Sequence, residues 1–297
     1  MHNIKRLAAV SSTTLALAVS YSLFQTPSAL GQSPAAGAPK GGAAKAPDAR
    51  VQQRTYHFAD TNEELPYALF VSSKVTKDKK APLIVALHGV FGDGNSLLRG
   101  SALDLAEDGG YVLVGPMGYN PQGWFGSPVI VMSGGPGKGK DKGPGVGKGG
   151  PPPTPEPPNL AELSEKDVMN VLAIVRKEFT IDDKRTYLMG HSMGGAGALF
   201  LGPKYVDQWA AVASMAPAAF RMQPESLAPV KDKMPLLLAH GDADTVVSID
   251  VGRRWAKTAT DLKMKDFKYL ELPGADHGTV ISQSMPEIFK FFKERAK

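Results

Sequence analysis

A serine stands at the centre of the segment Gly190-His191-Ser192-Met193-Gly194, which follows an apolar run and precedes a stretch of small residues. The pattern Gly-x-Ser-x-Gly is typical of a sharp turn from a strand into a helix, where larger side chains would collide with neighbouring backbone. Such a turn is strained and presents the serine hydroxyl at the edge of a sheet. The segment therefore predicts a nucleophile for acyl transfer at Ser192.

A serine hydroxyl is a weak nucleophile at neutral pH, so it needs a base, and the base needs an orienting acid. Two later candidate strands, 236–239 and 267–272, lead into short polar segments that contain Asp244 and His277. In an open parallel sheet the functional residues gather at the carboxyl ends of the strands. We therefore expect Ser192, Asp244 and His277 to meet at one edge of the sheet.

Other residues compete for these roles. Asp242 is the rival of Asp244 as the orienting acid, and the two alternatives stay open on the residues alone. Asp276 precedes His277 directly, but adjacent side chains diverge in an extended loop, so we assign it a structural role. The same role is assigned to three further histidines: His88, His191 and His240.

The elements that position these residues alternate between strands and helices, which predicts a mostly parallel sheet with helices on both faces. The run 81–87 is apolar throughout and fits a central strand buried on both faces. The two strands before it are expected to form an antiparallel hairpin at the N-terminal edge. The expected strands are 54–59, 67–73, 81–87, 111–114, 185–189, 210–215, 236–239 and 267–272. The main expected helices begin at Asn95 or Ser96, at 160, at 196, at 249 and at 285.

Four motifs together resemble the α/β-hydrolase superfamily: Gly-His-Ser-Met-Gly-Gly at 190–195, Leu-His-Gly at 87–89, His-Gly-Asp-Ala-Asp-Thr-Val-Val at 240–247 and Asp-His-Gly at 276–278. Within it, residues 167–187 resemble secreted esterases of the feruloyl-esterase and polyhydroxybutyrate-depolymerase-like group. The resemblance covers roughly residues 54–295 apart from one insertion. The chain departs from many such esterases in having no cysteine, and therefore no disulfide.

The resemblance implies an α/β-hydrolase fold and a role for each site residue. Ser192 attacks the substrate, His277 takes and returns the proton, and Asp244, rather than Asp242, holds the imidazole. The backbone N–H groups of Met193 and Val90 are expected to form the oxyanion hole, with Phe91 as the alternative to Val90.

Two aromatic residues, Tyr119 and Trp124, follow the 111–114 strand at the same end of the sheet. They are candidates for binding substrate, since binding pockets are largely apolar. Packing in the core is the other interpretation of both side chains.

The N-terminal region and one internal segment differ in composition from the rest of the chain. Residues 1–31 combine Lys5 and Arg6 with a short apolar run and small residues, which is typical of a secretory signal peptide. Residues 32–50 are predicted to be a disordered linker, and 134–158 a disordered Gly-, Pro- and Lys-rich insertion within the hydrolase domain at 51–297. We therefore expect a secreted or periplasmic protein, with no stable membrane insertion after the signal peptide is cleaved.

The charge of the chain argues against nucleic acid as a partner. The 297 residues carry a net charge of +5. Two of these positive charges lie in the signal peptide and a net two lie in 134–158, which leaves about +1 for the folded part. The motifs require no metal and no cofactor.

We therefore expect a secreted serine hydrolase that cleaves carboxylic esters, small or polymer-linked, through an acyl-enzyme intermediate. One alternative is a prolyl-oligopeptidase-type serine peptidase. Another is a non-catalytic binding protein with the α/β-hydrolase fold, in which the lysines of 134–158 contact a ligand.

Overall fold

The structure is a computed structural model that describes residues 46–130 and 157–297. The predicted signal peptide lies entirely outside the described residues. So do residues 32–45 of the predicted linker and 134–156 of the predicted insertion. These assignments stay predictions.

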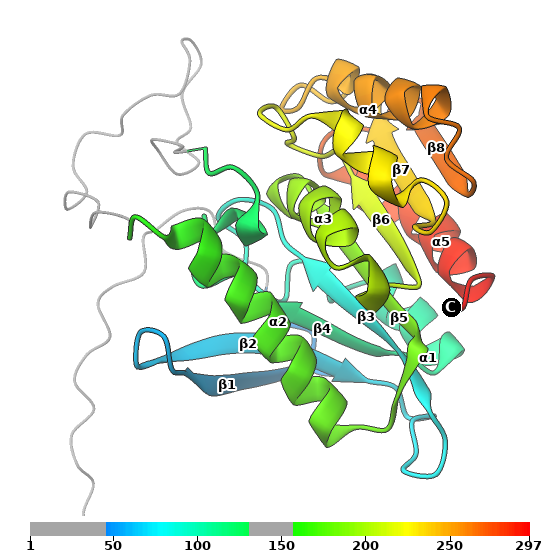
Figure 1. The fold of residues 1–297 in the computed structure, drawn as a ribbon. Coiled ribbons are helices and arrows are strands. Elements are labelled where there is room, and N and C mark those ends of the chain that lie inside the picture. The colour runs from blue at the N-terminus through cyan, green and yellow to red at the C-terminus, as the bar shows by residue number, and fades with distance from the viewer. Residues whose placement is uncertain (1–45, 131–156) are drawn as a thin grey trace, which may run out of the picture. The chain divides into compact units, whose positions relative to one another are not determined.

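The described residues contain an eight-stranded sheet with the order β1-β2-β4-β3-β5-β6-β7-β8 (Figure 1). Strands β1, β2 and β4 pair antiparallel, and from β4 through β8 every neighbouring pair is parallel. The predicted mostly parallel sheet with an antiparallel hairpin at its N-terminal edge is confirmed. The strands are β1 (Gln52–Phe58), β2 (Glu63–Val71), β3 (Ala81–Leu87), β4 (Val112–Pro116), β5 (Ile181–His191), β6 (Ala211–Met215), β7 (Leu236–Gly241) and β8 (Phe267–Leu272).

Helices cover both faces of this sheet. One face packs against α2 (Leu160–Glu178), α3 (Met193–Lys204) and α4 (Ile249–Asp261), and the other against α1 (Ser101–Gly109) and α5 (Thr279–Lys293). Figure 1 shows α2 and α3 in front of the sheet, with α1 and α5 behind it. This layering leaves the central strands shielded from water on both sides.

The central strand β3 explains why its sequence is apolar without alternation. Leu83, Val85 and Leu87 point into the core beneath α2 and α3, whereas Ile84 and Ala86 point into the core beneath α1 and α5. Successive strand residues face opposite sides, so a strand covered twice must be apolar at every position. The carboxyl end of β3 is thereby fixed in the middle of the sheet, beside the end of β5.

Helix α2 shows how a surface helix is positioned by its pattern. Val168, Leu172 and Val175 recur at helical spacing and are buried.

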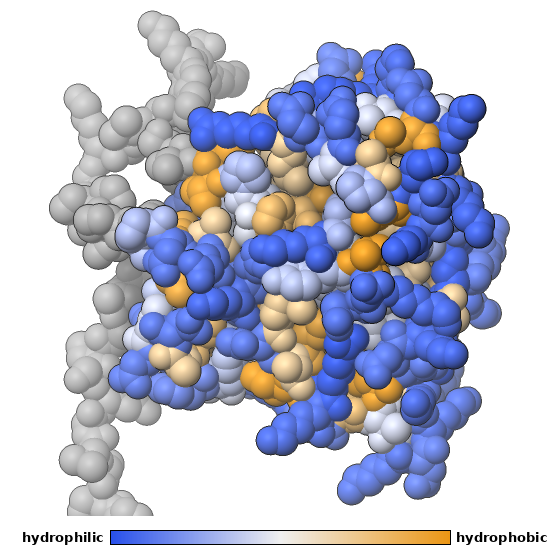
Figure 2. Space-filling model, in the orientation of Figure 1, coloured by the Kyte–Doolittle hydropathy of each residue, from blue (hydrophilic) through white to orange (hydrophobic). Residues whose placement is uncertain are grey.

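The face of the molecule seen in Figure 2 is mostly hydrophilic, with only small, separate apolar patches. Within the described ranges, no helix has both the length and the apolar character that crossing a membrane requires.

Helix α1 begins later than the sequence predicts. The expected cap at Asn95 or Ser96 is wrong, because these residues belong to a turn in which Asp93 accepts the N–H of Asn95 at 2.9 Å. The Asn95 side chain also exchanges hydrogen bonds of 2.7 and 2.9 Å with Gln53 of β1. The helix starts only at Ser101, after Gly100 in the left-handed region at φ +53°.

Helix α5 begins earlier than the sequence predicts, at Thr279 rather than 285. The carboxylate of Asp276 accepts the N–H groups of Gly278 and Thr279 at 2.9 and 2.7 Å, which satisfies donors at the helix start. Residues 279–284 include only two large apolar side chains, so apolar periodicity does not reveal this first part of the helix. Asp276 thus has the structural role expected of it.

Candidate active site

The turn at Ser192 joins the end of β5 directly to the start of α3. Ser192 has φ +57°, in the left-handed region that side chains other than glycine rarely occupy. A Cβ atom added to Gly190 would lie 2.0 Å from the carbonyl oxygen of Gly194, and one added to Gly194 would lie 2.1 Å from the carbonyl oxygen of Leu87. Both glycines are therefore required by close backbone approach.

Replacing Gly194 with alanine is expected to lower the free energy of unfolding by at least about 3 kcal/mol, because backbone atoms cannot move aside without breaking the sheet. Gly278→Ala is the matched control, since its Cβ atom would meet nothing closer than 3.6 Å. Urea denaturation measures both. Equal stability of the two variants would contradict the close approach described above.

The structure brings Ser192, His277 and Asp244 together, although 85 and 33 residues separate His277 from the other two. The Ser192 Oγ lies 2.9 Å from the His277 Nε2, and the His277 Nδ1 lies 2.7 Å from the Asp244 Oδ2. These side chains follow β5, β8 and β7 at the carboxyl ends of the strands. The three groups form one continuous line of hydrogen bonds.

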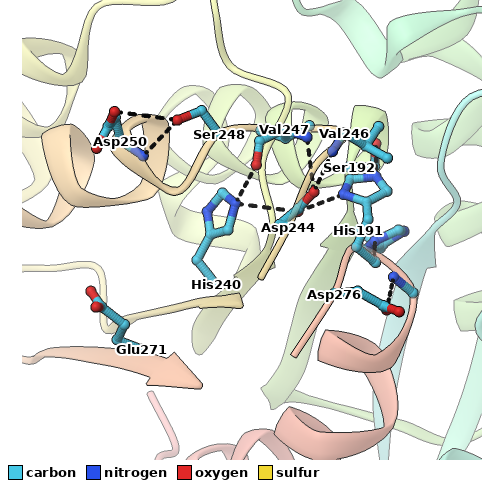
Figure 3. A network of polar contacts seen from close by, with 12 residues as sticks. His191, Ser192, His240, Asp244, Val246, Val247, Ser248, Asp250, Glu271 and Asp276 are labelled. Atoms are coloured by element: carbon cyan, nitrogen blue, oxygen red, sulfur yellow. Dashed lines mark hydrogen bonds and ion pairs between the residues drawn. The ribbon is translucent and has the colours of Figure 1, made fainter. Parts of the chain in front are cut away.

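The carboxylate of Asp244 is held in place from several sides (Figure 3). Its Oδ1 accepts the N–H groups of Val246 and Val247 at 2.8 and 2.9 Å, and its side chain is fully buried. Burial alone raises the pKa of this carboxyl, but the hydrogen bonds from His277 and from the two N–H groups outweigh it, and the pKa is lowered. Asp244 is therefore ionised at neutral pH.

Asp242, the rival candidate, lies elsewhere. Its Oδ1 accepts the N–H of Gly274 at 2.7 Å, and this hydrogen bond joins the loop after β7 to the loop after β8. Of the two aspartates, the structure places Asp244 against His277.

The backbone donors predicted for an oxyanion hole lie beside the serine. Val90, Met193 and Ser192 line the same cavity. Within the described residues, neither the Val90 N–H nor the Met193 N–H donates a hydrogen bond, whereas the Phe91 N–H donates to the Pro121 carbonyl at 2.9 Å. The Phe91 N–H, which was the alternative to Val90, is thus already occupied.

A cavity of about 390 Å³ opens beside Ser192 and His277. Three large apolar side chains of its wall stay well exposed: Phe91 at 40%, Phe220 at 48% and Val246 at 65%. They are the large apolar residues that the described part of the chain leaves exposed, and all three lie on this one cavity. Exposed apolar side chains gathered at one place usually mark a binding site.

The two aromatic residues predicted to bind substrate have different positions. Trp124 lines the cavity and is almost fully buried. Tyr119 is not among the residues that line it. The Tyr119 ring packs against Phe58, with 5.9 Å between the ring centroids, and its hydroxyl donates to Glu63 at 3.0 Å. Core packing, the other interpretation, accounts for Tyr119.

The segment that carries Trp124 is strained and firmly held. Trp124 and the next residue, Phe125, both have positive φ, at +59° and +49°. The Phe125 N–H donates to the Ser164 Oγ at 2.8 Å, and the Ser127 Oγ donates to the Trp124 carbonyl at 2.7 Å. Backbone strain of this kind persists only where the surroundings enforce it, and here α2 supplies Ser164.

Two of the remaining histidines support loops of the site. His88 is buried, with its ring nitrogens 2.8 Å from the carbonyl oxygens of Gly89 and Met117. His240 lies on the far side of Asp244, with its Nε2 3.0 Å from the Val247 carbonyl and 3.4 Å from the Asp244 Oδ2. Desolvation lowers the pKa of both histidines. Their structural assignment agrees with these contacts.

The third histidine, His191, is buried beside His277. Its Nε2 lies 2.7 Å from the His277 carbonyl oxygen. Burial, followed by the nearby His277 ring, lowers the pKa of His191 to about 4. Its ring is therefore neutral at neutral pH.

The low pKa of His191 predicts a loss of stability in acid. Between pH 6.5 and about 4, the unfolded chain binds more protons than the folded chain, so the free energy of unfolding falls as the pH is lowered through this window. We expect His191 alone to account for about 3 kcal/mol of this loss. Urea denaturation at pH 7 and pH 4.5 should show a smaller loss in His191→Gln than in the wild type.

The control for this prediction is His57→Gln, because the His57 side chain is 57% exposed. It should lose as much stability in acid as the wild type does. An unchanged acid loss in His191→Gln would contradict a low pKa for His191.

Within residues 46–130 and 157–297, no group of three or more His, Cys, Asp or Glu side chains is placed to hold a metal ion.

Comparisons with known sequences point to esterases. The model of a family described as "Putative esterase" matches residues 161–273, which include Ser192 and Asp244. The curated protein "Putative esterase NocK" of Nocardia uniformis subsp. tsuyamanensis is 28% identical over 173 residues, or 57% of this chain. The match spans 42% of that relative's length.

Comparisons with solved structures agree on the architecture. A thermostable esterase superposes with a TM-score of 0.59 and 24% identity, over 84% of this chain and 64% of the other. A CE1 ferulic acid esterase from Anaeromyces mucronatus superposes with a TM-score of 0.59 and 17% identity, over 86% and 93% of the two chains. The S-formylglutathione hydrolase FrmB of Staphylococcus aureus gives a TM-score of 0.57 and 14% identity, over 85% and 99%.

Proposed function

We propose that this chain, which has the α/β-hydrolase fold and resembles esterases of that fold, is itself a serine esterase. It would cleave carboxylic esters through an acyl-enzyme on Ser192. The observation that carries the proposal is the unbroken line of hydrogen bonds from Ser192 through His277 to Asp244 at the wall of a cavity. Fold alone would not suffice, because unrelated functions share it.

The first step acylates the enzyme. The His277 Nε2 takes the proton of Ser192 as the Oγ bonds to the ester carbonyl carbon, and the carbonyl electron pair moves onto its oxygen. The N–H groups of Val90 and Met193 donate to this oxyanion. When the carbonyl re-forms, the bond to the alcohol oxygen breaks, and the imidazolium of His277 gives its proton to the departing alcohol.

The second step releases the acid. Water replaces the alcohol, and His277 takes a proton from it as its oxygen attacks the acyl carbon. The bond to Ser192 then breaks, and the imidazolium returns the proton to the serine oxygen. Throughout, ionised Asp244 accepts the Nδ1–H of His277, which fixes the tautomer and stabilises the imidazolium.

The cavity favours an ester whose groups near the carbonyl are uncharged and apolar. Among the described residues, its wall includes no lysine, arginine, aspartate or glutamate, and His191 is neutral at neutral pH. A charged group next to the ester would lose water there without gaining an ion pair. Both small and polymer-linked esters could reach the serine, because the apolar wall residues Phe91, Phe220 and Val246 are open to solvent.

The proposed location is outside the cytoplasm. The composition of residues 1–31, with a basic start followed by a short apolar run and small residues, supports cleavage as a secretory signal peptide. Mass analysis of protein recovered from the medium or periplasm tests this, because cleavage near residue 31 shortens the chain by a defined mass.

A panel of p-nitrophenyl esters tests the activity. We expect acetyl, butyryl, long-chain and feruloyl esters to be hydrolysed, and an ester with a carboxylate beside the carbonyl to react much more slowly. An alkyl fluorophosphonate should form an adduct on Ser192 in the folded protein. Faster cleavage of peptide amides than of esters would favour a peptidase. No adduct and no hydrolysis would leave only a binding role.

A further inference from the structure

His191 is a buried titratable side chain that the proposed reaction does not use. We propose that His191 is a positioning residue. Its side chain forms one hydrogen bond with the backbone of the catalytic base, His277, and its own backbone leads directly into the nucleophile, Ser192. The inference rests on the proposed function, since it assigns His277 as the base. It concerns the geometry of the hydrogen-bonded side chains Ser192, His277 and Asp244, which we call the relay, and it does not concern the substrate.

The hydrogen bond has a definite direction. The His191 Nε2 lies 2.7 Å from the carbonyl oxygen of His277. A carbonyl oxygen can only accept, so the His191 Nε2 carries the hydrogen. The two rings lie side by side, with their centroids 4.6 Å apart and an interplanar angle of 50°. His191 therefore contacts both the backbone and the ring of His277.

The position of His191 in the chain gives this bond its effect. His191 ends β5 and immediately precedes Ser192, whereas His277 lies on the loop between β8 and α5. Strands β6 and β7 separate β5 from β8 in the sheet. The hydrogen bond from His191 thus connects the end of β5 to the loop after β8, and no strand pairing joins these two segments directly. It sets how close the His277 Nε2 comes to the Ser192 Oγ.

A third loop confines the His191 ring. A Cβ atom on Gly89 would lie 3.4 Å from the His191 Nδ1 and 3.3 Å from the Ser192 Cβ. The loop that carries the predicted oxyanion donor Val90 therefore passes over both residues. His191 fills the space where three loops of the site meet.

The neutral ring of His191 suits this position. A lysine or arginine could donate to the same carbonyl, but its positive charge would oppose the imidazolium that His277 forms in the reaction. His191 donates without a charge, because its pKa is about 4. A polar but uncharged side chain of similar length should therefore replace it, and an apolar one should not.

His191→Gln and His191→Met make a matched pair for the test, since both side chains are unbranched and similar in length, and only glutamine can donate. For p-nitrophenyl butyrate we expect kcat of His191→Met to fall by about 30- to 100-fold, since a misplaced catalytic group costs this much. His191→Gln should stay within about fivefold of the wild type. The rate of labelling by an alkyl fluorophosphonate should fall in parallel with kcat.

Circular dichroism and urea denaturation at pH 7 establish that both variants are folded. A kcat of His191→Met within twofold of the wild type would overturn the proposal, and so would an equal fall in the two variants. A wild-type protein that neither hydrolyses esters nor reacts with the fluorophosphonate would instead overturn the proposed function itself.

Discussion

Replacing Ser192 with alanine is expected to lower kcat for ester hydrolysis by at least about 10⁴-fold. The substitution removes the only oxygen that the His277 Nε2 contacts in the relay, at 2.9 Å, so no acyl-enzyme can form. The remaining activity should resemble direct attack by water, assisted by the Val90 and Met193 N–H groups. Spectrophotometric assays with p-nitrophenyl butyrate measure the loss.

The control for Ser192→Ala is Ser282→Ala, because the Ser282 hydroxyl donates to the Thr279 carbonyl within α5, away from the cavity. This variant should keep the wild-type rate and still take up the fluorophosphonate. Ester hydrolysis at the wild-type rate by Ser192→Ala would rule out Ser192 as the nucleophile.

Replacing Asp244 with asparagine is expected to lower kcat by about 10⁴-fold while the fold stays intact. An asparagine amide at this position can donate to the His277 Nδ1, which would leave the hydrogen on Nε2, facing Ser192. The ring could then no longer accept the serine proton. The effect should appear in kcat, with little change in KM, because Asp244 does not line the cavity.

Asp242→Asn is the matched control, with the same chemical change two residues away. Asp242 accepts the Gly274 N–H and does not contact His277. Its amide oxygen can still accept that hydrogen bond, so we expect activity within about threefold of the wild type, and stability changed by less than about 1 kcal/mol. A larger loss of activity in Asp242→Asn than in Asp244→Asn would reverse the assignment of the two residues.

The residues of the relay were predictable because each carries a local signal. The glycines around Ser192 reflect close backbone packing, because an added Cβ atom at Gly190 or Gly194 would lie about 2 Å from a carbonyl oxygen. Asp244 and His277 each follow a predicted strand, and the carboxyl ends of parallel strands lie at the same end of the sheet. These local signals single out Ser192 and His277. Asp242 follows the same strand as Asp244, and only the resemblance to α/β-hydrolases favours Asp244.

The cavity wall was not predictable in the same way. Phe220 and Val246 lie on separate loops, after β6 and β7. Phe220 belongs to no motif, and Val246 lies in the motif at 240–247 without a predicted role there. Their exposure depends on how those loops fold over the sheet. Tyr119 shows the reverse case, since an aromatic residue in a suitable loop packs against Phe58 instead of lining the cavity.

The errors at helix ends share a cause. The start of α1 depends on Asn95 bonding to Gln53, 42 residues earlier in the chain. The start of α5 depends on Asp276, which also precedes the candidate base. Capping contacts and long-range side-chain pairs do not alter apolar periodicity, so a prediction based on that periodicity misses them.

The strand order has a consequence for how the protein would lose activity. Strand β8 is the outermost strand of the parallel side, pairs only with β7 among the described strands, and is mostly half-buried. Edge segments of this kind open locally at a lower free energy than the centre of a sheet. Since β8 leads to His277, and the inner strand β5 leads to Ser192, gentle denaturation should detach the base while the nucleophile keeps its place. Hydrolysis should then cease at a lower urea concentration than the one that changes the fluorescence of the buried tryptophans.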